Sequence, residues 1–150
     1  MREGVPMEFK RILVVDDEPL MRDFLVETLK RKKYLVEAVG NGSQAMEKVK
    51  TEYYDLVVTD IRMPEVSGME VLEEVKKINP ETEIIMITAF GTIENAVGAM
   101  KLGAYDYITK PFSADEIEIL VDRAMERQRL RDENRALRNY NTQLRNQLKE

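Results

Sequence analysis

Five short apolar runs alternate with amphipathic segments over most of the chain. The runs are rich in isoleucine, valine and leucine without polar alternation, which is typical of strands buried on both faces. They predict strands at residues 10–16, 34–39, 55–60, 83–88 and 105–108. Because a segment with helical spacing follows each run, we predict an α/β domain whose five-stranded parallel sheet is covered by helices on both faces.

Proline and serine residues indicate where several helices begin. Pro19 sits where a first-turn proline is tolerated, and Ser43 can cap the second helix. Ser67 and Ser113 each stand three residues before a glutamate, which is the capping-box spacing. In the first helix the apolar side chains recur at helical spacing: Leu20, Phe24, Leu25 and Leu29.

A short fourth helix is predicted from Thr92, with a glycine in its middle. Gly98 lowers the intrinsic stability of this helix by roughly 1 kcal/mol relative to alanine, which makes the helix a candidate for a mobile element. Its apolar side chains are predicted to share one face: Ile93, Ala96, Val97 and Met100.

The last helix is expected to run beyond the globular part, because neither glycine nor proline follows Pro111. Three leucines recur every seven residues, as at the d positions of a heptad repeat: Leu130, Leu137 and Leu144. The complementary a positions hold Asn134, Asn141 and Leu148. Since asparagine at a positions favours a parallel, in-register pair, we predict that residues 126–150 form a short coiled coil joining two copies of the chain. The alternative is a solvated single helix, because the heptads are few.

The composition narrows the possible chemistry and location. The chain has neither cysteine nor histidine, which excludes disulfides and zinc ligation through these side chains and leaves oxygen ligands for metals. Residues 1–9 are predicted to be a flexible leader, too polar for a signal peptide, and no apolar run is long enough for a membrane span. We therefore expect a cytoplasmic protein without membrane contact. The net charge of -5 gives no general attraction to nucleic acid.

Polar residues stand at the carboxyl ends of four predicted strands. Asp16 and Asp17 follow the first strand, Asp60 and Thr88 end the third and fourth, and Lys110 follows the fifth. The carboxyl ends of neighbouring parallel strands meet at one edge of a sheet, where ligands bind. Three carboxylates cannot all ionise close together without a cation, so we expect Mg²⁺, or alternatively Mn²⁺, at this edge. Asp60 stands alone and is the candidate nucleophile for attack on phosphorus.

In order and approximate spacing, these residues resemble the receiver domain of two-component response regulators. The resemblance covers about residues 10–125 and is carried by four motifs: Asp16-Asp17, Asp60 with Met63-Pro64, Thr88-Ala89 and Lys110-Pro111. It implies a flavodoxin-like (CheY-like) fold and transfer of a phosphoryl group from a partner histidine kinase to Asp60. It also implies a phosphoacceptor with slow self-catalysed phosphorylation and dephosphorylation, and not a turnover enzyme.

The same resemblance implies roles for individual residues. Lys110 and Thr88 are expected to contact the phosphoryl group, and Tyr107 falls at the position of the family's switch aromatic, which turns inward when Thr88 moves. Magnesium is expected to be held by Asp16, Asp17, Asp60 and, through its backbone carbonyl, Arg62.

Within that family, residues 60–64 and 88–112 and the long helix look most like receivers of NtrC-type activators of sigma-54 transcription. Those proteins continue into an ATPase and a DNA-binding domain, so DNA contact is expected only through an output domain that residues 1–150 do not contain. Whether the chain is a fragment of a longer activator or a stand-alone receiver is left open. Phosphorylation is expected to alter the face made by the fourth helix, the fifth strand and the last helix, and with it the dimer geometry.

Four other interpretations are weaker. Residues 40–45 follow a strand and open a helix as a dinucleotide-binding fingerprint does, but they leave the acidic residues unexplained. Arginines beside the tail leucines resemble a basic-region zipper, but acidic residues are interleaved with them. A magnesium-dependent phosphatase needs a second acid near the nucleophile, and the position two residues after Asp60 is Arg62. The fourth interpretation is a scaffold protein whose acidic pocket is chemically inert.

Overall fold

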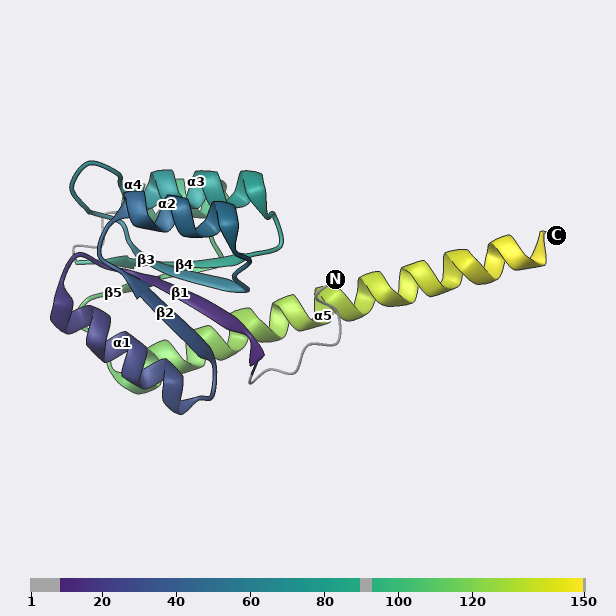
Figure 1. Cartoon of the computed structure of the whole chain (residues 1–150), viewed down its shortest axis with the longest axis horizontal. Coiled ribbons are helices and arrows are strands. Elements are labelled where there is room, and N and C mark those ends of the chain that lie inside the picture. The colour runs from purple at the N-terminus through teal and green to yellow at the C-terminus, as the bar shows by residue number, and fades with distance from the viewer. Residues whose placement is uncertain (1–8, 90–92, 150) are drawn as a thin grey trace.

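The computed structural model describes residues 9–89 and 93–149, and it places a central sheet between two layers of helices (Figure 1). The strands and helices alternate along the whole domain: β1 Arg11–Val15, α1 Pro19–Arg31, β2 Leu35–Val39, α2 Gly42–Thr51, β3 Leu56–Asp60, α3 Gly68–Ile78, β4 Glu83–Thr88, α4 Ile93–Lys101, β5 Asp106–Thr109 and α5 Ala114–Leu148. Helices α1 and α5 cover one face of the sheet, and α2, α3 and α4 cover the other (Figure 1). The predicted α/β architecture is confirmed.

All five strands are parallel, in the order β2-β1-β3-β4-β5. The chain moves outward from β1 to β2 and then returns to the other side of β1, so the topology reverses between β1 and β3. In open α/β sheets, ligands bind beyond the carboxyl ends of the strands at such a reversal. The register places Asp60 opposite Ile87, one residue before the end of β4.

Each face of the sheet carries its own apolar core, because alternate residues of a strand point to opposite faces. Leu13 of β1 and Val57 of β3 pack beneath α2, α3 and α4. Ile12 of β1 and Leu56 of β3 pack against α1 and α5. All of these side chains are fully buried, as the continuous apolar runs predicted.

The helix caps agree with the sequence at two of three serines. The hydroxyls of Ser67 and Ser113 accept hydrogen bonds from backbone N–H groups three residues later, both at 3.2 Å. The expected cap at Ser43 is wrong. Asn41 caps α2, and its side chain accepts a hydrogen bond of 2.8 Å from the N–H of Gln44, so Ser43 lies inside the first turn. Both residue types can cap, and the extended backbone of Asn41 decides between them.

Helical spacing alone does not separate buried from exposed apolar side chains in α1 and α4. Leu20 is 85% exposed and does not face the core. It lies nine residues before the buried Leu29, about two and a half helical turns, so the two side chains project from opposite sides of α1. In α4 Ala96 and Ala99 are buried, whereas Val97 and Met100 are exposed. The side chain of Ile93 lies outside the described part of the chain. The predicted start at Thr92 lies outside the described residues.

The last helix runs without interruption from Ala114 to Leu148 and projects away from the domain (Figure 1). Its first half contributes Ile117, Val121 and Ala124 to the core, and its second half carries mostly exposed residues. The expected extension of this helix is confirmed. No helix among the described residues has both the length and the apolar composition needed to cross a membrane. The predicted leader lies outside the described residues, apart from Phe9.

Candidate functional site

Three aspartates meet at the carboxyl edge of the sheet. Asp16 and Asp17 directly follow β1, and Asp60 is the last residue of the neighbouring β3. Each offers a carboxylate oxygen, and these oxygens lie within 4.8 Å of one another. Asp16 and Asp60 are buried, whereas Asp17 is exposed. The parallel pairing of β1 with β3 thus brings together residues that are 43 or 44 positions apart in the chain.

Lys110 supplies the positive charge of this cluster. Its ammonium lies 3.3 Å from Oδ2 of Asp60, 3.6 Å from Oδ2 of Asp16 and 3.0 Å from Oε1 of Glu18. Lys110 directly follows β5 and precedes a cis peptide bond to Pro111. Glu18 was given no role from the sequence, although it continues the acidic run after β1. One ammonium therefore faces three carboxylates.

Backbone N–H groups orient the two buried carboxylates. The N–H of Glu18 donates to Oδ1 of Asp16 at 2.9 Å, and the N–H of Arg62 donates to Oδ1 of Asp60 at 3.1 Å. In both aspartates the second oxygen, Oδ2, is the one that faces Lys110. The two loops after β1 and β3 therefore hold the carboxylates with a defined oxygen directed into the site.

The electrostatics of the site favour binding of a cation. Burial raises the pKa of Asp60 above the ordinary value of an aspartate, against the opposing effect of the Lys110 charge. Burial likewise raises the pKa of Asp16, against the hydrogen bond from Glu18 and the charge of Lys110. Burial lowers the pKa of Lys110, but its hydrogen bond to Glu18 and the charges of Asp16 and Asp60 outweigh that effect, and the net change is upward. An additional cation would relieve the remaining carboxylate repulsion.

The donor set fits a hard divalent ion. Oδ2 of Asp16 is buried and accepts no hydrogen bond from any described residue, although the ammonium of Lys110 lies nearby. Mg²⁺ prefers oxygen ligands and is usually bound through one or two carboxylates together with water or phosphate oxygens. Asp16, Asp17 and Asp60 offer three carboxylates at one place, and Arg62 lies in the loop directly after β3.

Thr88 and Tyr107, the two switch positions expected from the sequence, lie on the neighbouring strands. Thr88 ends β4 next to Asp60 and is buried, and its backbone carbonyl accepts a hydrogen bond of 2.7 Å from the N–H of Lys110. Tyr107 lies on β5 and is 40% exposed. Its side chain borders a hollow of about 400 Å³ that is lined also by Ala96, Val97, Met100 and Lys101 of α4.

Gly68 is a residue of the site that the sequence interpretation missed. It opens α3 against the backbone of Asp60, where a Cβ atom at this position would lie 2.0 Å from the carbonyl oxygen of Asp60. Its N–H donates to the carbonyl of Ile61 at 2.9 Å. No local signal separates this glycine from an ordinary turn glycine, because the close approach comes from α3 packing on β3. Gly42, within the alternative dinucleotide fingerprint, similarly approaches the backbone of Val66.

The predicted dimer positions lie on the exposed part of α5. Leu130, Leu137 and Leu148 are more than half exposed, and Leu144 is 39% exposed. Asn134 and Asn141, at the intervening a positions, are exposed as well. The six residues recur at heptad spacing on a continuous helix and so form one stripe along it.

Residues 12–122 match the response regulator receiver domain family. The chain therefore belongs to this family, as the fold and the acidic site had indicated. Its relatives are regulators of the NtrC type, which confirms the resemblance found in the sequence. The transcriptional regulatory protein ZraR of Klebsiella oxytoca is 40% identical over 119 residues, which are 79% of this chain and 27% of the relative. The regulatory protein AtoC of Escherichia coli is 37% identical over 127 residues, 85% of this chain and 28% of the relative.

Solved structures agree with this assignment. NtrX from Brucella abortus matches with a TM-score of 0.81 and 35% identity over 86% of this chain and 30% of its own. A response regulator receiver domain protein from Clostridium thermocellum matches with a TM-score of 0.76 and 33% identity over 81% of this chain and 98% of its own. The chain thus spans the whole of an isolated receiver but only about a quarter of the two curated relatives.

Proposed function

We propose that this receiver accepts a phosphoryl group on Asp60 from a histidine kinase, in a reaction that requires Mg²⁺ or Mn²⁺. The observation that supports this most directly is the placement of Lys110, whose ammonium lies 3.3 Å from Oδ2 of Asp60 beside two further aspartates. This arrangement combines a carboxylate nucleophile, a fixed positive charge and a set of metal ligands. Phosphoryl transfer needs little covalent chemistry from the protein beyond such positioning and charge stabilisation.

In the proposed reaction, a carboxylate oxygen of Asp60 attacks phosphorus while the bond from phosphorus to the imidazole nitrogen of the kinase breaks. An aspartyl phosphate forms, and the nitrogen leaves with the electron pair of the broken bond. Lys110 compensates the negative charge on the transferred group, and the hydroxyl of Thr88 donates a hydrogen bond to it. Asp16, Asp17, Asp60 and the carbonyl of Arg62 would hold the divalent ion, which would neutralise negative charge of the carboxylates and of the phosphoryl group. Slow hydrolysis of the aspartyl phosphate by water releases inorganic phosphate and returns the free aspartate.

The proposed output is a change in the face formed by α4, β5 and α5. Tyr107 is half-exposed beside the apolar side chains of Val97 and Met100, so inward rotation of its ring would reshape this surface. We assign residues 10–125 to the receiver and residues 126–150 to a linker that pairs with a second copy through the heptad stripe. The cytoplasm is the proposed location, and control of transcription is proposed to act through an output domain outside residues 1–150.

Intact mass after incubation with acetyl phosphate and Mg²⁺ tests the phosphoacceptor role. A gain of one phosphoryl group is expected in the wild type, with no gain in Asp60→Asn or in the presence of a metal chelator. Asp106→Asn, a change to an aspartate at the start of β5, is the matched control and should still gain the group. Phosphorylation that persists in Asp60→Asn would overturn the assignment.

A further inference from the structure

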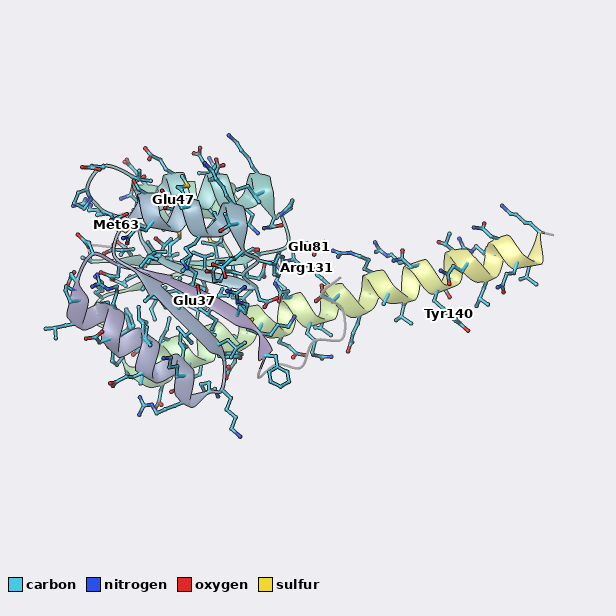
Figure 2. All side chains as sticks on the ribbon, viewed as in Figure 1. Glu37, Glu47, Met63, Glu81, Arg131 and Tyr140 are labelled. Atoms are coloured by element: carbon cyan, nitrogen blue, oxygen red, sulfur yellow. The ribbon has the colours of Figure 1, made fainter. Side chains whose placement is uncertain are left out.

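A second cluster of charged and polar side chains lies at the opposite, amino-terminal edge of the sheet. It joins the strand ends to α5 just where the helix leaves the domain, near the labelled Glu81 and Arg131 in Figure 2. We call this cluster the linker clamp and define it by eight residues: Lys10, Asp55, Glu81 and Glu83 on the sheet side, and Gln128, Arg131, Asp132 and Arg135 on α5.

The centre of the linker clamp is a buried lysine. Lys10 is 1% exposed, and its ammonium donates to Oε1 of Gln128 at 3.1 Å. The same ammonium lies 3.7 Å from Oδ1 of Asp55 and 3.5 Å from Oδ2 of Asp132. Gln128 is also 1% exposed, and its amide donates to the carbonyl of Asp55 at 2.8 Å and to that of Glu81 at 3.3 Å. Buried groups with this many mutual contacts hold a specific arrangement, because any loss leaves a polar group unsatisfied.

Arginines extend the linker clamp farther along α5. Arg131 donates to Oε1 of the buried Glu83 at 2.9 Å and to the carbonyl of Glu81 at 3.1 Å. Arg135 forms an ion pair with Glu81. The last core residue of α5 is Met125, so the polar contacts continue the attachment by about ten residues, or roughly 15 Å of helix.

The heptad assignment places most clamp residues of α5 on the side away from the predicted dimer stripe, and Arg131 beside that stripe. With Leu130 at d, Gln128 and Arg135 fall at b, Arg131 at e and Asp132 at f. The a and d residues beyond this point, from Leu130 to Leu148, remain exposed. One side of the helix is therefore held by its own domain while the other is presented outward.

We propose that the linker clamp is a positioning device that fixes the direction and rotation of the linker and so presents its heptad stripe to a second copy of the chain. Asp55 directly precedes β3 and Glu83 opens β4, the two strands whose other ends carry Asp60 and Thr88. The clamp thus anchors the linker to two of the strands that carry residues of the proposed phosphorylation site. The part of the proposal that concerns assembly rests on the proposed dimer, whereas the orientation of the linker is a property of the single chain.

The absence of cysteine allows a direct test by distance measurement between two spin labels. Glu47→Cys on α2 and Asn139→Cys, next to the labelled Tyr140 on the projecting part of α5, provide the sites (Figure 2). The doubly labelled chain is diluted with excess unlabelled chain, so that only distances within one chain are measured. A narrow distribution of the distance between the two labels is expected when the clamp is intact.

Gln128→Ala with Arg131→Ala removes the clamp contacts, and Gln143→Ala with Arg138→Ala is the matched control on the exposed part of the same helix. The clamp variant is expected to broaden the distribution at least twofold, and the control to leave it unchanged. Arg131→Ala alone serves if the double variant does not fold, and Arg131→Lys is expected to restore much of the narrow distribution. Equal distributions in clamp and control variants would overturn the proposal.

Sedimentation of the unlabelled variants tests the consequence for assembly. Loss of the clamp is expected to raise the dissociation constant of the dimer at least fivefold relative to the control. The reason is that a linker of variable direction is less often in the orientation that allows pairing. A dimer that is unchanged in the clamp variant would overturn the role in assembly. A wild-type chain that stays monomeric would instead refute the proposed dimer, and the spin-label distances would still decide whether the clamp orients the linker.

Discussion

The ammonium of Lys110 lies 3.3 Å from Oδ2 of Asp60 and 3.6 Å from Oδ2 of the neighbouring Asp16. This contact sets the charge balance of the site, because Lys110 is the cation that opposes the raised pKa of both aspartates.

Lys110→Met is expected to slow phosphorylation by acetyl phosphate about 100-fold, since removal of one fixed charge-stabilising donor typically costs this much in rate. The rate of mass gain at saturating Mg²⁺ measures the effect. Lys101→Met, which removes an exposed lysine from α4, is the control and should react like the wild type. Equal rates for Lys110→Met and the control would show that the charge at Lys110 is not needed for transfer.

Removal of the divalent ion is expected to lower the melting temperature. An ion present at 100 times its Kd stabilises the folded state by about 2.7 kcal/mol, which corresponds to several degrees for a chain of this size. Asp17→Asn should lose most of this Mg²⁺-dependent shift, because it removes one of three carboxylates. Asp23→Asn, on the exposed side of α1, should retain it. A full shift in Asp17→Asn would exclude Asp17 as a ligand.

Glu37 on β2 is expected to contribute pH-dependent stability. The hydrogen bond from the hydroxyl of Tyr54 lowers the pKa of Glu37, and Arg11 contributes further. Because the pKa is lower in the folded state, the unfolded state binds more protons, and the stabilisation is present above the ordinary glutamate pKa and lost as the pH falls through the folded value. Glu37→Gln should therefore lower the free energy of unfolding at pH 7 by roughly 0.5–1 kcal/mol, a modest loss because the carboxylate is partly solvated.

Urea titrations of Glu37→Gln at pH 7 and pH 3 measure this effect, with Glu47→Gln at an exposed position of α2 as the control. The difference from the wild type should be smaller at pH 3. A difference of the same size at both pH values would mean that the ionised form of Glu37 is not the stabilising one.

Replacement of two glycines by alanine is expected to change the free energy of unfolding in opposite directions. Gly68→Ala places a Cβ atom 2.0 Å from the backbone oxygen of Asp60, so it should cost about 3 kcal/mol of unfolding free energy and disturb the phosphorylation site. At Gly98 in α4 a Cβ atom would meet, among the described residues, Cε of Met69 at an ordinary 3.5 Å. Gly98→Ala should therefore stabilise the protein by about 1 kcal/mol.

Thermal unfolding and the rate of phosphorylation, measured on both glycine variants, test this contrast. Two variants of equal stability would contradict the close approach of α3 to β3. If Gly98 also provides the mobility expected of α4, the alanine variant will show a smaller change in the exposure of Tyr107 on phosphorylation, which tyrosine fluorescence can follow.

The strands and the converging aspartates were predictable because their signals are local. Continuous apolar runs indicate strands buried on both faces, and parallel pairing necessarily brings the residues after β1 and β3 to one edge. Asp16, Asp17 and Asp60 could therefore be placed together without knowledge of distances. Lys110 was predictable for the same reason, as the first residue after β5.

Helix faces and close approaches were less predictable. Leu20 has the spacing of a core residue when compared with Phe24 but projects from the far side of α1 relative to Leu29. The contact between Gly68 and Asp60 depends on how α3 packs against β3, and the sequence around Gly68 resembles any helix start. Such features follow from the relative placement of whole elements, which local periodicity does not encode.

The sequence by itself determined the alternation of strands and helices, the set of acidic residues at the strand ends and the continuous helix after Pro111, since each depends on residues close together in the chain. The tertiary structure decided which oxygen faces Lys110, which side of α5 is held and which is exposed. The contact between Lys10 and Gln128 spans 118 positions. Only the folded sheet, which brings the residue before β1 against the middle of α5, creates that contact and with it the orientation of the linker.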